Sequence, residues 1–172
     1  MNEGQNTADQ TQYLTFHIAG EEYAVGILRV KEIITYGTLT KVPQTPPSIR
    51  GVINLRGSVV PVVDIAVRFG LPPSPVTNRT CIVIVELNLA AEQTVMGIMA
   101  DSVSEVVELI ADDILPAPPF GTHVSTDFLR GMGKAGAKFV LILDIDKVLS
   151  AADMVPPSPN TTQAGFVSVA TG

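Results

Sequence analysis

The stretch Ile49-Arg-Gly-Val-Ile-Asn-Leu-Arg-Gly-Ser-Val-Val-Pro-Val-Val-Asp64 decides the fold. Two apolar runs, Val52–Leu55 and Val59–Val63, flank the dipeptide Arg56-Gly57, and this pattern is typical of a β-hairpin. Pro61 lacks a backbone amide donor, so its strand is expected at a sheet edge or at a bulge. The segment therefore predicts a local antiparallel unit.

The same pattern returns later in the chain, which indicates an internal repeat. At an offset of 80 residues, Arg50-Gly51 matches Arg130-Gly131 and Val60–Ile65 matches Val140–Ile145. At an offset of 73, Val30–Ile34 matches Val103–Val107 and Val42-Pro43 matches Leu115-Pro116, so the register changes in the segment 116–126. Short apolar motifs also match by chance because strands share a composition. The repeat still favours two similar β-subdomains.

Two aspartates follow the repeated strands and look like helix N-caps. Asp64 and Asp144 each end an aliphatic run and precede apolar residues at helical spacing. The spacing is clearest after Asp144, where the apolar positions i, i+3, i+4 and i+7 are Ile145, Val148, Leu149 and Ala152. The pattern predicts a short helix near the C-terminus.

Further apolar segments are bounded by Gly, Pro or Asp and read as strands. An N-terminal hairpin is expected from Tyr13–Ile18 and Tyr23–Val25, with Gly20-Glu21 as its turn. The other expected strands are Thr80–Leu87, Thr94–Ala100, Val103–Leu109, Phe128–Met132 and Lys138–Leu143. The fold class is therefore mainly β.

The two ends of the chain are polar or rich in proline. Residues 1–11 and 155–172 lack hydrophobic periodicity, so we expect disordered tails around one ordered domain, 12–154, with a subdomain junction near residues 70–80. The N-terminus has no basic start followed by an apolar stretch, and no apolar run approaches the roughly 20 residues of a membrane span. These features predict a cytoplasmic protein without membrane insertion.

Composition argues against several classes of function. The chain is acidic, with a net charge of −6 and a pI of about 4.8, and it has no Trp, which disfavours nucleic-acid binding. One cysteine and two distant histidines, His17 and His123, provide neither a metal site nor a catalytic constellation. We expect no cofactor and no enzymatic activity, although a small-molecule-binding or enzymatic β-barrel stays open. The apolar fraction of 46% with only 16% charged residues favours protein partners.

Several motifs together resemble one family, the CheW chemotaxis coupling proteins. The matching segments are Glu22–Ile33, Ile49–Gly57, Val60–Asp64, Asp101–Val106, Leu115–Phe120, Leu129–Gly131 and Val140–Leu143. The resemblance covers about residues 12–154 and omits only the tails. It implies two SH3-like five-stranded β-barrel subdomains around a shared apolar core.

The resemblance also implies a function. Members of this family are non-catalytic cytoplasmic adaptors that couple the tips of chemoreceptors to a CheA-type histidine kinase in arrays at the membrane. A paralogous array controlling pili, surface sensing or another output is the alternative. Neighbouring genes would distinguish the two.

Site residues follow from the same resemblance. A receptor-tip groove between the subdomains is expected to involve Val30, Glu32, Gly51, Arg56 and Val103. Kinase contacts are expected at Leu39, Thr40 and Val42 on the first barrel and at Phe120 on the other. Taken without the resemblance, the two valines could be core residues, the glycine a backbone necessity and the arginine an ordinary solvated residue.

Overall fold

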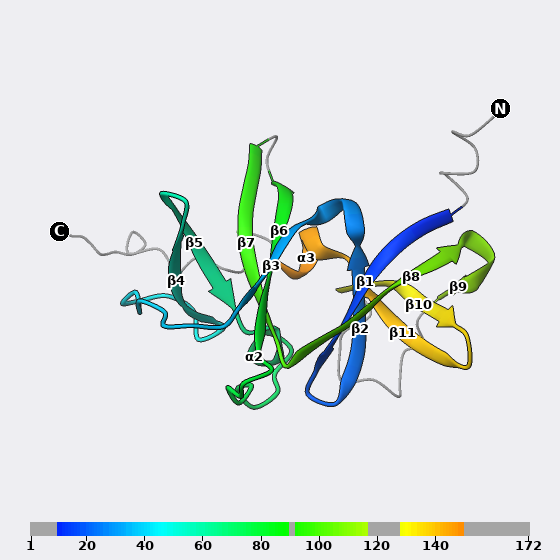
Figure 1. Cartoon of the computed structure of the whole chain (residues 1–172), viewed down its shortest axis with the longest axis horizontal. Coiled ribbons are helices and arrows are strands. Elements are labelled where there is room, and N and C mark those ends of the chain that lie inside the picture. The colour runs from blue at the N-terminus through cyan, green and yellow to red at the C-terminus, as the bar shows by residue number, and fades with distance from the viewer. Residues whose placement is uncertain (1–9, 90–91, 117–127, 150–172) are drawn as a thin grey trace.

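The computed structural model describes residues 10–89, 92–116 and 128–149, which form two β-sheets (Figure 1). We call residues 30–100 the first subdomain; its sheet has the order β3-β6-β7-β5-β4. Its strands are β3 (Val30–Thr35), β4 (Ile49–Leu55), β5 (Ser58–Val63), β6 (Cys81–Leu89) and β7 (Glu92–Ala100).

The second subdomain combines residues 10–26 with residues 102–149, and its sheet has the order β8-β1-β2-β11-β10-β9. Its strands are β1 (Gln10–Ile18), β2 (Glu21–Gly26), β8 (Ser102–Ile110), β9 (Ile114–Leu115), β10 (Leu129–Ala135) and β11 (Lys138–Leu143). The short helices are η1 (Ile27–Arg29), α2 (Ile65–Arg68), η2 (Ala111–Asp113) and α3 (Ile145–Val148). The prediction of a mainly β chain with two β-subdomains and a short helix near the C-terminus is confirmed.

The internal repeat is visible in the strand order of the two sheets. Strands β3, β6, β7, β5 and β4 occupy the same successive places as β8, β1, β2, β11 and β10. The sixth strand, β9, pairs Leu115 with Met132, and its counterpart is the isolated bridge between Thr40 and Val52. Thr40, not Val42, is therefore the equivalent of Leu115. The expected match of Val42 with Leu115 is wrong by two residues because the chain before Leu115 is two residues longer.

The subdomains are interleaved along the chain. The chain crosses from the second subdomain to the first at η1 and returns at Asp101, between β7 and β8. Residues 70–80, where the sequence suggested the junction, connect α2 to β6 inside the first subdomain. Strand β1 begins at Gln10, so two residues that we expected in the N-terminal tail belong to the sheet. The remaining tail residues, 1–9 and 155–172, lie outside the described residues.

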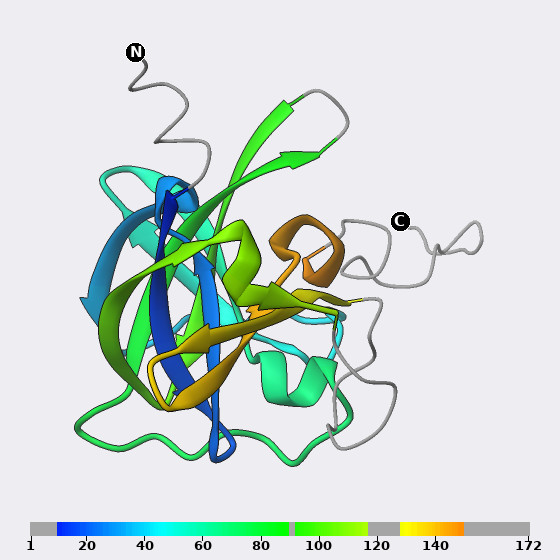
Figure 2. The ribbon, with the colours of Figure 1, turned by 90° about the vertical axis from the view of Figure 1, so that its right-hand side faces the viewer.

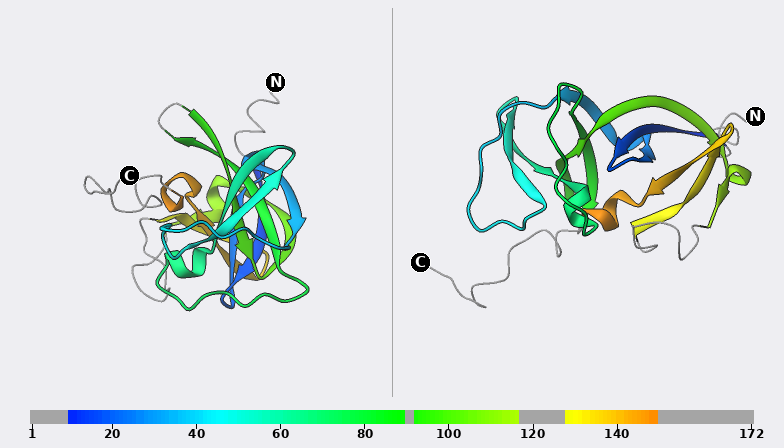
Figure 3. Two further views of the ribbon diagram at one scale, coloured as in Figure 1. Left: turned by 90° about the vertical axis from the view of Figure 1, so that its left-hand side faces the viewer. Right: turned by 90° about the horizontal axis from the view of Figure 1, so that it is seen from below.

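Three apolar clusters explain how strand alternation builds this arrangement. One cluster packs on one face of each sheet. It includes Val60, Ile82 and Met99 in the first subdomain and Leu109 and Ile142 in the second. The opposite faces of both sheets contribute to a third, larger cluster. It contains Phe16, Tyr23, Leu141, Val85 and Ile98 among others, so it is the shared core that the resemblance implied. Seen from below, the two subdomains lie side by side with α3 between them (Figure 3).

Each repeated hairpin contains a bulge that requires glycine. The register shifts between Ile49 and Gly51 in β4 and between Leu129 and Gly131 in β10. A Cβ atom at Gly51 would lie 2.7 Å from the carbonyl oxygen of Thr40, and one at Gly131 would lie 2.6 Å from that of Leu115. A neighbouring chain segment thus approaches each glycine too closely for any side chain.

Both predicted aspartate caps are confirmed, and among the described contacts only Asp64 is part of a larger network. The Asp64 carboxylate accepts the Ala66 amide at 3.1 Å, and the Asp144 carboxylate accepts the Lys147 amide at 3.3 Å. Asp64 is fully buried and also accepts hydrogen bonds from Arg50 and Ser74, whereas Asp144 is partly exposed. Figure 2 shows α2 and α3 as separate short helices near the two sheets. No helix in the described part of the chain is long and apolar enough to cross a membrane.

Candidate functional site

Glu32 and Arg56, the two charged residues expected at the receptor groove, form an ion pair. Glu32 lies in β3 and Arg56 in the turn between β4 and β5, so the pair joins the two edges of the first sheet. Arg56 Nη2 donates to Glu32 Oε1 at 3.0 Å, and Nη1 donates to Oε2. This bidentate geometry is the strong form of an arginine–carboxylate contact. We call it the first clasp.

The first clasp remains accessible from solvent. The side chain of Arg56 is 73% exposed and that of Glu32 is 26% exposed. The hydrogen bond from Arg56 lowers the pKa of Glu32, and the same bond raises the pKa of Arg56, so both stay charged near neutral pH. The charged pair is therefore accessible to a protein partner where the two edges of the first sheet come together.

The second subdomain has an ion-pair group of its own, which the sequence analysis missed. Lys138, at the start of β11, lies 3.0 Å from Glu22 Oε1 and 3.4 Å from Glu105 Oε2. Glu105 is the residue that matches Glu32 in the 73-residue repeat, which is the signal that could have indicated this pair. We call Lys138, Glu22 and Glu105 the second clasp. Because Lys138 contacts a glutamate in the neighbouring strand β2 and another in the edge strand β8, the second clasp ties β11 to both strands.

The second clasp gives a pH-dependent contribution to stability. Burial, the largest single influence, would raise the pKa of Glu22, but hydrogen bonds from Lys138 and Thr15 and the charges of Lys138 and His17 together lower it. A lowered pKa in the folded state means that the contribution is complete above the ordinary value of 4.5 and is lost as the pH falls below it. We expect Glu22→Gln to flatten the fall in melting temperature between about pH 5 and pH 3. If the melting temperatures of wild type and Glu22→Gln fall equally steeply with pH over this range, the assignment is contradicted.

The remaining residues expected at the receptor groove lie deeper. Val30 is the first residue of β3 and Val103 the second of β8, and both are partly buried against the shared core. Gly51 is buried beneath the Thr40 backbone, where it serves the bulge rather than the surface. The structure thus brings Glu32 and Arg56 into contact and places the two valines on one apolar cluster.

The residues expected at the kinase contacts differ in exposure. Leu39 packs against the interior cluster of the first subdomain, whereas Thr40 and Val42 are exposed. Thr40 is held by backbone hydrogen bonds to Val52 at 3.0 and 2.8 Å. Phe120 lies outside the described residues. The accessible part of this set is therefore Thr40 and Val42.

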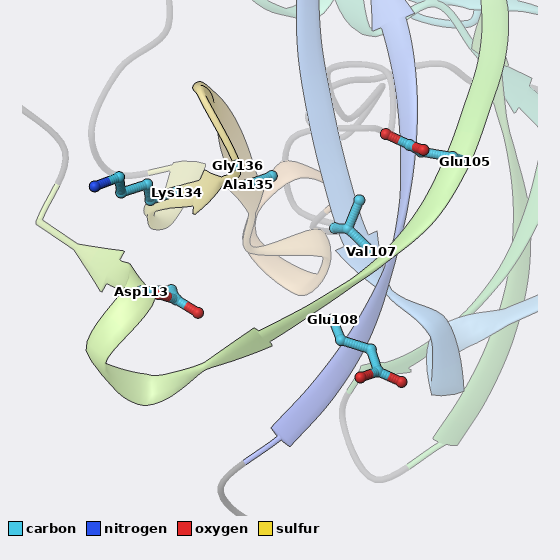
Figure 4. Close-up of a pocket in the computed structure, with 7 residues that line it drawn as sticks. All are labelled: Glu105, Val107, Glu108, Asp113, Lys134, Ala135 and Gly136. Atoms are coloured by element: carbon cyan, nitrogen blue, oxygen red, sulfur yellow. The ribbon is translucent and has the colours of Figure 1, made fainter.

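A groove of about 520 Å³ opens between β8 and the β10–β11 hairpin (Figure 4). Its lining residues are Glu105, Val107, Glu108, Asp113, Lys134, Ala135 and Gly136. This mainly polar, open lining differs from the enclosed apolar pockets typical of small-molecule sites. Within the described residues, no group of three or more His, Cys, Asp or Glu side chains is arranged to hold a metal ion.

Comparison with known proteins agrees with this architecture. Residues 12–153 match the family model described as CheW, CheW-like domain. The chemotaxis protein CheW of Klebsiella aerogenes is 37% identical over 143 residues, which cover 83% of this chain and 84% of that protein. The Bacillus subtilis chemotaxis protein CheW is 34% identical over 137 residues, covering 79% and 85% of the two chains.

A solved structure supports the same relationship. The crystal structure of the scaffolding protein TtCheW from Thermoanaerobacter tengcongensis gives a TM-score of 0.73 at 31% identity. The match covers 84% of this chain and 91% of that one. With the family model spanning most of the sequence and both β-subdomains shared with a solved relative, the chain belongs to the CheW family of chemotaxis proteins.

Proposed function

We propose that this protein is a non-catalytic adaptor that couples the cytoplasmic tip of a chemoreceptor to a CheA-type histidine kinase. Family membership carries the chemotaxis role, and the exposed first clasp is the observation that supports a specific docking site. The adaptor acts in the cytoplasm and is recruited to receptor arrays at the membrane.

The receptor site in this proposal combines an apolar base with a charged rim. Val30 and Val103 pack on the shared core and provide apolar surface where the subdomains meet. Glu32 and Arg56 provide paired charges beside them. An amphipathic helical hairpin suits this combination, because its apolar stripe supplies buried area and its polar flanks fix the register. Gly51 supports the site through the backbone of β4.

The kinase contacts in this proposal lie on the segment that pairs with β4 through Thr40 and Val52, whereas the first clasp lies at the turn that follows β4. Exposed Thr40 and Val42 form a candidate surface on the first subdomain, with Leu39 packed beneath it. Phe120 remains the proposed contact on the second subdomain. The proposal requires that one chain hold both partners at once.

Pairwise binding tests the proposal. The full chain is titrated by calorimetry with a purified receptor-tip fragment and, separately, with the regulatory domain of a CheA-type kinase. We expect saturable binding to each, and prior saturation with one partner should leave binding of the other intact. Failure to bind the receptor fragment, or mutually exclusive binding, would reject the adaptor role.

The proposal also expects no catalysis by the chain alone. A histidine kinase, phosphatase or nucleotide-binding protein needs a phosphate cradle or a phospho-accepting constellation. We expect no saturable heat on titration with ATP and no release of phosphate. Stoichiometric ATP binding in the calorimeter would contradict this expectation.

A further inference from the structure

The turn η1 displays an unusually exposed apolar side chain. Leu28 is 89% exposed, the highest value among the large apolar side chains in the described part of the chain. Its neighbours Ile27 and Val30 pack against the shared core. The amide of Val30 also donates to the carbonyl oxygen of Ile27, which closes the turn. The turn is thus fixed from beneath while Leu28 faces solvent.

Arg29 ties the same turn to both subdomains. Its Nε donates to the carbonyl oxygen of Glu86 in β6 at 2.9 Å, and its Nη2 donates to Asp146 Oδ1 in α3. Strand β6 belongs to the first subdomain, and α3 follows the last strand of the second. Leu28 therefore lies in a crossover segment that the hydrogen bonds of Arg29 fix to both subdomains.

A single exposed leucine is common on protein surfaces and carries no inference by its exposure alone. Leu28 differs in two respects. Its backbone is ordered before any partner arrives, so docking costs little further conformational entropy. Its turn, η1, also directly precedes β3, the strand that contributes Val30 and Glu32 to the proposed receptor site.

We propose that Leu28 is an apolar anchor for the helical receptor hairpin and that Arg29 is its positioning residue. The inference rests on the proposed function, because it takes the same partner and extends the same site. Leu28 and Glu32 are separated by at most roughly 11 Å along the chain, given two steps of about 2.0 Å in the 3-10 turn and two of about 3.3 Å in β3. Two turns of an α-helix rise about 11 Å. One helix can therefore place an apolar residue on Leu28 and a polar residue at the first clasp.

Substitution of Leu28 tests the anchor directly. Because the side chain is almost fully exposed, Leu28→Ala should leave the melting temperature unchanged. Its affinity for the receptor-tip fragment should fall about tenfold, as for a well-placed interface anchor. The matched control is Val76→Ala, which shortens another apolar side chain, 51% exposed, in the connection between α2 and β6. The control should bind within twofold of wild type; equal binding by Leu28→Ala would overturn the proposal.

A double substitution tests the positioning role of Arg29. If Arg29 acts through Leu28, Arg29→Ala should weaken receptor binding in the wild-type background but not further in the Leu28→Ala background. Additive losses would show that Arg29 acts independently of Leu28 and would overturn its assigned role. Kinase binding should be unaffected in all variants.

The same titrations separate this inference from the proposed function. Suppose that wild type binds the receptor fragment, that Arg56→Glu weakens this binding and that Leu28→Ala does not. This result would overturn only the proposal that Leu28 is an anchor. Absence of receptor binding by wild type would remove both proposals.

Discussion

Asp64→Ala is expected to lower the free energy of unfolding by about 3 kcal/mol, because it leaves several buried polar groups without partners. Asp64 is fully buried, and its carboxylate accepts the Ser74 amide at 2.9 Å, the Ser74 hydroxyl at 3.1 Å and Arg50 Nη1 at 2.8 Å. It also caps α2 through Ala66. The substitution removes all four hydrogen bonds at once. Chemical denaturation followed by circular dichroism measures the change.

The equivalent aspartate of the second subdomain provides a matched control. Asp144 caps α3 through Lys147 alone among its described side-chain contacts, and it is partly exposed. Asp144→Ala should therefore cost only about 1 kcal/mol, the usual effect of losing an N-cap. Equal losses for the two substitutions would show that the Arg50–Asp64–Ser74 network does not stabilise the first subdomain.

Arg56→Glu is expected to reduce affinity for the receptor-tip fragment roughly thirtyfold, because it replaces attraction by repulsion at the proposed interface. The fold should persist, since the side chain is 73% exposed in a turn. Binding of the kinase regulatory domain through the Thr40 and Val42 surface should survive. Arg79→Glu makes the same charge change at another exposed arginine of the first subdomain and should leave receptor affinity unaltered.

Because Arg56 is paired with Glu32 in the first clasp, the effect of Arg56→Glu on the fold must be separated from its effect on binding. Arg56→Glu would place two carboxylates together at the seam between β3 and β4, so a loss of binding could arise from an opened sheet edge. The exchange Glu32→Arg with Arg56→Glu restores an ion pair of opposite polarity. Because the partner would then meet reversed charges, we expect thermal stability to recover and receptor affinity to stay low. Recovery of affinity by the exchange would mean that the clasp only supports the fold.

Local patterns were sufficient to predict much of the fold. The hairpin from Ile49 to Asp64 was predicted because its apolar runs, its turn and its cap all lie within one segment. Strand β3, Val30–Thr35, was not among the expected strands. Ile33 is 42% exposed while the adjacent Ile34 packs inside the sheet, so two apolar residues in succession hide the alternation.

Long-range pairing was beyond the reach of the sequence. The N-terminal hairpin joins the second subdomain because β2 pairs in parallel with β11, with Tyr23 opposite Leu141. The repeat does not indicate which hairpin joins which sheet. Each sheet needs one such hairpin, and the chain supplies β1–β2 before η1 and β6–β7 after it. The assignment depends on which apolar faces meet in the shared core.

The candidate site was predicted in part, and for physical reasons. The resemblance indicated Glu32 and Arg56 as separate contacts, but their ion pair depends on how the sheet brings its two edges together. The exposure of Leu28 could not be predicted, because the adjacent Ile27 is equally apolar and packs against the shared core. The second clasp was recoverable, because Glu105 already matched Glu32 in the repeat.

Receptor control of the kinase in a reconstituted system tests the coupling role most directly. Autophosphorylation of a CheA-type kinase is measured with clustered receptor-tip fragments, with and without the full chain. Wild type should make the kinase rate depend on the receptor, and the Arg56→Glu variant, which still binds the kinase, should not. A kinase rate that responds to the receptor equally well without the chain, or that never responds in its presence, would contradict the account.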